Sequence, residues 1–86
     1  MKKKPLTPAE RDWLAKLQSL LNECPSDRLG AYTIGDADIE IYDTRYESQI
    51  NERLESGNVD FCSAVSDTGA GLISLKMPFC VHSTAG

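Results

Sequence analysis

The chain has 86 residues, of which 41% are hydrophobic and 26% charged, with a formal net charge of −4. This size and composition are typical of one domain (1–86), and no apolar run approaches the roughly 18 residues of a membrane span. Three cysteines, an odd number without framework spacing, fit reduced thiols in a reducing compartment better than a secreted disulfide scaffold. No apolar leader follows the first lysines, so we expect a cytoplasmic protein.

The charge is unevenly distributed along the sequence. Lys2, Lys3 and Lys4 supply three of the nine basic residues, which leaves six basic and thirteen acidic side chains, a formal −7, in the rest. Such an acidic body repels phosphates, so we predict no nucleic acid partner and no membrane partner. Residues 1–5 are expected to form a flexible, solvated basic tail.

The first predicted helix runs from Pro8 to about Cys24. Thr7 at the N-cap, Pro8 at the first helical position and Glu10 at the third form a capping box, and Pro25 ends the helix. Apolar residues recur along one side at helical spacing, and we interpret this stripe as the side that packs on the core. The stripe consists of Ala9, Trp13, Leu14, Leu17, Leu20, Leu21 and Cys24.

After a loop, residues 31–43 predict a β-hairpin that turns at Gly35-Asp36. Glycine accepts the positive φ that a type II′ turn requires, and a two-residue loop fixes the register, with Tyr32 opposite Ile39. The alternation then predicts one apolar face, which consists of Tyr32, Ile34, Ala37, Ile39 and Ile41. The other face is predicted to be solvent-exposed and acidic, and it consists of Ala31, Thr33, Asp38, Glu40 and Tyr42.

Two more helices are predicted after the hairpin. Thr44 and Glu47 are spaced as a second capping box, with Asp43 beside it, and Gly57 suits the end of that helix. A narrow apolar stripe follows, made of Tyr46, Ile50 and Leu54. Residues 58–66 favour a short helix with Asp60 at its N-cap, and its apolar positions are Phe61, Ala64 and Val65.

The C-terminal part predicts a third strand. Residues 66–71 favour a turn, and 72–76 a strand beside the hairpin with Ile73 and Leu75 inward. Residues 79–82 suggest a short edge strand, and 83–86 a loose terminus. The order helix, strand, strand, helix, short helix, strand predicts an α+β two-layer sandwich. In it, a three-stranded antiparallel sheet is covered on one face by the two longer helices.

Asp67-Thr68-Gly69-Ala70 resembles the active-site turn of retroviral-type aspartic proteases. In that family two copies each supply one aspartate, and the pair shares a proton that activates water. Only sixteen residues follow Ala70, too few for the rest of that fold, and the sequence before the motif is helical. A dimeric aspartic protease is therefore an alternative function, and our leading interpretation assigns no catalytic residue.

Cys24, Cys62, Cys80 and His82 are residues of the types that bind zinc, and a Cys₃His set would suit a structural site. The close pairing of ligands typical of such sites is absent. We therefore interpret them as core thiols and a surface histidine, and predict no cofactor, with a zinc-stabilised domain as a further alternative. A cysteine–histidine pair for thiol catalysis has no third residue to orient it.

Residues 29–43, the segment 60–65 and the terminal His-Ser-Thr-Ala-Gly resemble small accessory proteins encoded by lambda-like phages and prophages of enteric bacteria. The similarity spans most of residues 25–86. The resemblance implies a small cytoplasmic protein that binds and modifies host machinery instead of catalysing a reaction. It assigns no role to any residue.

The sequence thus predicts a non-enzymatic protein-binding module. A rigid acidic strand face with tyrosines beside it has the ingredients of an interface for a basic protein surface, such as a host protein that handles nucleic acid or serves in defence. The predicted partner-binding residues are Asp36, Asp38, Glu40 and Tyr42. The outer strands have edges that can also pair with a second copy in a homodimer.

Overall fold

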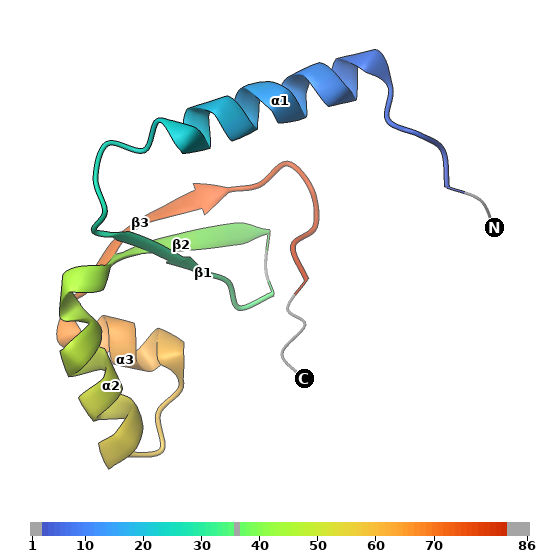
Figure 1. Ribbon diagram of the computed structural model, residues 1–86. Coiled ribbons are helices and arrows are strands. Elements are labelled where there is room, and N and C mark those ends of the chain that lie inside the picture. Colours follow the sequence, from blue (N-terminus) through green and yellow to red (C-terminus); the bar gives the residue numbers. More distant parts are fainter. Residues whose placement is uncertain (1–2, 36, 83–86) are drawn as a thin grey trace.

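A computed structural model of the chain describes residues 3–35 and 37–82 (Figure 1). The predicted α+β class and the three-stranded antiparallel sheet are confirmed. Asp36 of the predicted turn, the first two residues of the basic tail and the terminal segment 83–86 lie outside the described residues. The elements are α1 (Pro8–Asn22), β1 (Leu29–Tyr32), β2 (Asp38–Asp43), the 3₁₀ helix η1 (Thr44–Tyr46), α2 (Glu47–Ser56), α3 (Phe61–Thr68) and β3 (Gly71–Lys76).

The sheet has the order β1-β2-β3, so β2 is the central strand, and β3 lies beside the hairpin as predicted. The predicted hairpin register is wrong by one residue, because Tyr32 pairs with Glu40 and not with Ile39. The connection between the strands is therefore longer than two residues. The Thr33 hydroxyl closes it by donating to the Asp38 carbonyl (3.2 Å) and accepting from the Gly35 N–H (3.2 Å).

The shifted register changes which residues of β2 share a sheet face with Tyr32 of β1. Since side chains alternate along a strand, Tyr32 lies on the same face as Glu40 and Tyr42, and the isoleucines of β2 lie on the other face. Tyr42, predicted on the wet face, is buried. The aromatic side chains, and not the isoleucines, therefore point into the core.

The core lies where α2 and α3 pack against one face of the sheet, at the end where β2 runs into η1 (Figure 1). Phe61 of α3 packs edge-on against Tyr32 (ring centroids 5.2 Å apart) and Tyr42 (5.4 Å). Gly30 pairs with Tyr42 across the sheet, and the tyrosine ring covers the space that a side chain there would need. The buried apolar residues are Tyr42, Ile50, Ala64, Val65 and Ala70.

Local capping sets the ends of these helices. Asp60 begins the predicted short helix α3 by accepting from the Ser63 N–H (2.8 Å). Gly69 ends α3 in the left-handed region (φ 74°), so α3 runs two to three residues into the predicted turn. At the other helix, Asp43 and not Thr44 is the cap, because its side chain accepts from the Arg45 N–H (2.9 Å).

Helix α1 has the predicted capping box of Thr7 and Glu10, and it ends at Asn22. Within the described chain, none of its residues is buried. In Figure 1, α1 runs along one side of the sheet, and α2 and α3 lie toward the other side. The predicted layer of α1 and α2 on one sheet face is therefore not confirmed. Residues 79–82, all of them described, form no strand.

The resulting molecule is open. Its radius of gyration is 16.1 Å and its extents are 48 × 35 × 17 Å. A compact domain of this length has a radius of gyration of about 12 Å. The difference arises because α1 stands away from the body formed by the sheet, α2 and α3.

Candidate functional site

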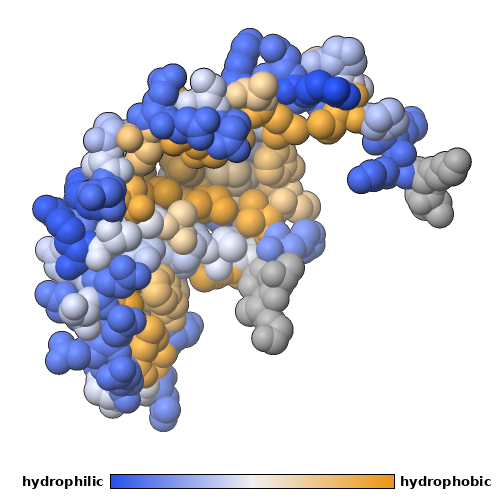
Figure 2. Space-filling model, viewed as in Figure 1, coloured by the Kyte–Doolittle hydropathy of each residue, from blue (hydrophilic) through white to orange (hydrophobic). Residues whose placement is uncertain are grey.

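The most distinctive surface is an apolar one between α1 and the sheet. Figure 2 shows hydrophobic side chains along the inner side of α1 and on the sheet that faces it, with a hollow between them. We call this surface the apolar groove. Its exposed apolar side chains are Trp13, Leu14, Leu17, Leu20 and Leu21 from α1, Leu29 from β1, Ile73 and Leu75 from β3, and Phe79.

The helix wall of the groove is the stripe that the sequence predicted to be core. Trp13 is 47% exposed, and its one aromatic neighbour in the described chain is Phe79, at 6.2 Å and edge-on. A cleft of 470 Å³ opens beside this pair. It is lined almost wholly by apolar side chains, with Glu10 at its rim. The interpretation of Trp13 as a core residue is therefore wrong.

The sheet wall carries the isoleucines and leucines that the shifted register turned away from the core. Ile73 pairs with Ile41, and Leu75 with Ile39, across the ladder between β2 and β3. Ile73 is 62% exposed, although the sequence predicted it to point inward. The reason is that α2 and α3 cover the tyrosine face, which leaves the aliphatic face of the sheet uncovered.

The predicted acidic binding face is not the open surface that the sequence suggested. Asp38 is held by Lys76 of β3 (3.1 Å), so its charge is partly compensated. Glu40 is half-buried, opposite Ser74. Tyr42 is buried, and burial is the main cause that raises its pKa. Asp36 lies outside the described residues, and a partner role for these four residues stays a prediction.

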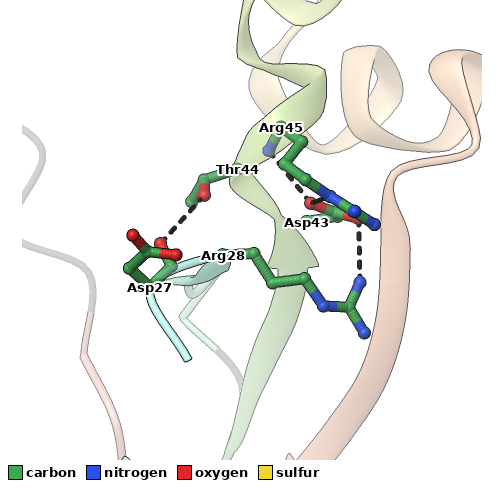
Figure 3. A network of polar contacts seen from close by, with 5 residues as sticks. All are labelled: Asp27, Arg28, Asp43, Thr44 and Arg45. Atoms are coloured by element: carbon green, nitrogen blue, oxygen red, sulfur yellow. Dashed lines mark hydrogen bonds and ion pairs between the residues drawn. The ribbon is translucent and has the colours of Figure 1, made fainter. Parts of the chain in front are cut away.

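A polar network that the sequence analysis missed joins three segments at the end of β2 (Figure 3). The buried carboxylate of Asp43 accepts from Arg45 (Nη2, 2.7 Å) and from Arg28 (Nη1, 2.8 Å). The hydrogen bonds from Arg45, and then the one from Arg28, lower the pKa of Asp43 well below its usual range. The Thr44 hydroxyl donates to the Asp27 carbonyl (3.4 Å).

Backbone hydrogen bonds complete this junction. The Asp43 N–H donates to the Ala70 carbonyl (2.9 Å), and the Thr44 N–H donates to the Arg28 carbonyl (2.7 Å). The junction therefore ties the loop before β1 and the residue after α3 to the end of β2. Its geometry is that of a structural cap, since the Asp43 carboxylate accepts from the Arg45 N–H and from the side chains of Arg45 and Arg28. The sequence signal for it is an aspartate directly before the helix start.

The protease-like motif has a structural role. Asp67 lies in the last turn of α3 and forms an ion pair with Arg53 of α2 (2.8 Å). The Thr68 hydroxyl donates to the Ala64 carbonyl (2.9 Å). Gly69 is the C-cap of the helix. The motif thus ends a helix and joins α3 to α2, and this geometry lends no support to the aspartic protease alternative.

The cysteines and the histidine are not brought together. Among residues 3–35 and 37–82, no three side chains of the His, Cys, Asp or Glu type lie close enough to hold one metal ion. The prediction of core thiols is wrong for Cys24 and Cys80, which are both exposed. The Cys24 thiol donates to the Ser26 carbonyl (3.3 Å). Cys62 is half-buried beside Tyr32, whose pKa is raised to about 12 by burial first and by Cys62 second. The described geometry thus offers no zinc site.

Comparison with known proteins finds no family model that matches the chain, and no curated protein or solved structure with significant similarity. In the described part of the chain, no helix combines the length and the apolar character needed to cross a bilayer. The surface of the molecule itself is therefore the remaining indication of its function.

Proposed function

We propose that the chain is a non-enzymatic protein-binding module whose binding surface is the apolar groove. The observation that carries this proposal is the uncovered apolar stripe of α1 opposite an uncovered apolar sheet face. Contiguous apolar surface of this kind is rare on monomeric proteins and marks interaction sites. Trp13 and Phe79 supply the aromatic anchors that often dominate binding energy at the centre of an interface.

The acidic face is a second candidate surface within the same proposal. Asp38 and Glu40 still lie on one side of β2 and carry charge. The resemblance to phage accessory proteins supports a host protein as the partner, and the three free thiols support a cytoplasmic location. The acidic side chains of this second surface favour a host partner with a basic surface, while the apolar groove binds its own partner.

Site-specific photo-crosslinking in cells tests which surface binds. A photoreactive amino acid replaces Leu17 in the groove or, as the matched control, Ser19 on the outer side of α1, and both positions are exposed. We expect a discrete crosslinked product from position 17 and none from position 19. The mass of the product identifies the bound protein. Equal products from both positions, or none from position 17, would contradict the proposal.

A further inference from the structure

We propose that the occupant of the apolar groove is a second copy of this chain, in a two-fold dimer in which α1 of each copy packs on the sheet of the other. The inference rests on the proposed function, because it names the partner of the same groove. It commits to one arrangement, in which the helix stripe and the sheet face are the two halves of one repeated interface.

The exposed area supports an obligate partner. The chain has an accessible surface of 7018 Å². A compact monomer of 9.5 kDa exposes only about 5000 Å², so each copy carries roughly 2000 Å² in excess. If each copy buries half of that excess or all of it, the dimer interface buries about 2000–4000 Å² in total, which is the range of obligate homodimers.

The groove is complementary to itself. An amphipathic helix needs an apolar surface to pack on, and an apolar sheet face needs a helix to cover it. This chain has one of each, on α1 and on the side of the sheet away from α2, and within one copy neither buries the other. A two-fold axis places each helix on the other copy's sheet, so a single geometry covers both surfaces twice.

The hinge for this exchange is the segment 23–28 between α1 and β1. The sheet end of this segment is fixed, because the Arg28 carbonyl accepts from the Thr44 N–H (2.7 Å). At the helix end, Glu23 and Cys24 cap α1 through their N–H groups, and Pro25 follows. The segment is therefore the point at which the capped helix can turn relative to the fixed sheet. Exchange of a terminal element across such a hinge is a common route to dimers.

Charge allows two copies to approach through the groove. The charged side chains of the middle of α1, Asp12 and Lys16, form an ion pair (3.2 Å) on the side away from the apolar stripe. The net charge is −4 per copy, and Glu10 is the one charged residue among those that line the cleft beside Trp13 and Phe79. The repulsion of the net charge is screened beyond about 8 Å at physiological salt. The contact itself is between apolar side chains.

The first test is the solution mass and size of the unmodified protein. Sedimentation equilibrium and small-angle X-ray scattering over a wide concentration range should give twice the 9.5 kDa chain mass. A monomer that keeps a radius of gyration near 16.1 Å at millimolar concentration overturns the dimer, and the groove then remains available to another protein. A monomer with a radius of gyration of about 12 Å means that α1 has closed onto its own sheet, and this result overturns the dimer and the proposed function together.

The second test introduces complementary charges on the two sides of the proposed contact. We expect Leu17→Glu and Ile73→Lys each to weaken dimerisation by at least a hundredfold. The controls are Ser19→Glu, on the outer side of the helix, and Ser74→Lys, on the other face of the sheet. Each should change the dimer dissociation constant by no more than a few times. Mixing Leu17→Glu with Ile73→Lys should restore a dimer, because one intact helix then meets one intact sheet and the other contact pairs a glutamate with a lysine. No recovery on mixing, with both variants folded by circular dichroism, would overturn the helix-on-sheet arrangement.

Discussion

The body of the molecule and helix α1 are both built from well-formed elements, but only the body buries them. In the body, Ile50 of α2 and Val65 of α3 are almost fully buried, in one core cluster with Tyr42 of the sheet. In α1, a capping box and a regular apolar stripe produce a helix whose leucines stay exposed. Local signals thus specify a helix, while its burial depends on what the chain, or a second chain, presents to it.

The comparison separates two sources of stability. The body holds itself together through burial, an aromatic cluster and the Asp43 junction. An isolated helix of the length of α1 is at best marginally stable in water, since most helix stability in proteins comes from packing. The four predictions that follow test whether the two regions differ as the structure indicates.

The largest difference is expected between core and groove truncations. Ile50→Ala removes a side chain with no exposed surface and should lower the free energy of unfolding by about 3 kcal/mol. Leu20→Ala, in the exposed stripe of α1, should cost less than about 0.5 kcal/mol in the monomer. Urea unfolding at concentrations too low for dimers measures both. Equal losses would show that α1 is packed as tightly as the body. If Ile50→Ala does not fold, Ile50→Val, at about 1 kcal/mol, replaces it.

Gly30 tests the aromatic packing of the body. A Cβ atom at Gly30 would lie 2.6 Å from Cε1 of the Tyr42 ring, so the ring must move. We expect Gly30→Ala to cost about 2 kcal/mol by overpacking. Gly57→Ala is the matched control, because its Cβ meets nothing closer than 4.0 Å. A Gly30→Ala variant as stable as the control would show that Tyr42 does not lie over β1.

The Asp43 junction gives the body an acid sensitivity. Because Arg45 and Arg28 lower the pKa of Asp43 in the folded state, its ionised form stabilises the fold at neutral pH. That contribution is lost as the pH falls below about 4, the usual aspartate value, toward the lower folded value. Thermal unfolding between pH 7 and pH 2 should therefore show a shallower acid-side loss for Asp43→Asn than for the natural chain. Parallel curves would contradict the role of this carboxylate.

The smallest effect is expected from the cap of α1. Thr7→Ala removes the hydroxyl that accepts from the Glu10 N–H (3.1 Å) and should destabilise the helix by about 1 kcal/mol. At concentrations too low for dimers α1 is not buried against the body, so hydrogen exchange should quicken in α1 alone and the unfolding midpoint of the body should stay the same. The corresponding cap variant Asp60→Ala in α3 should shift that midpoint. A shift from both would show that α1 and the body unfold as one unit.

The sequence was informative wherever a local pattern decides the outcome. The capping box at Thr7, the cap at Asp60 and the strand after Gly71 are set by neighbours a few residues away, and each was predicted correctly. The position of the third strand beside the hairpin was also predicted, but not which hairpin strand it pairs with. These features need no knowledge of distant contacts, because the residues that cause them lie within one turn or one strand.

The register and the site depended on distant contacts instead. A shift of one residue between β1 and β2 changes which side chains point inward, and Phe61 of α3, far along the chain, favours the face with Tyr32 and Tyr42. The alternation alone is compatible with either choice. The apolar groove was missed for the same reason, since an amphipathic stripe predicts that a helix needs a partner surface but does not say which surface it is.

The central position of β2 has a consequence for the order of folding. Its pairing with β1 closes a short connection, whereas its pairing with β3 encloses residues 44–70, with α2 and α3 inside. Closing the longer segment costs more chain entropy, so we expect the hairpin to form first and β3 to dock last. Docking of β3 also brings Ala70 to the Asp43 N–H. During synthesis, the sheet can be completed only after Lys76 has emerged, and until then the edge of β2 that pairs with β3 stays unpaired.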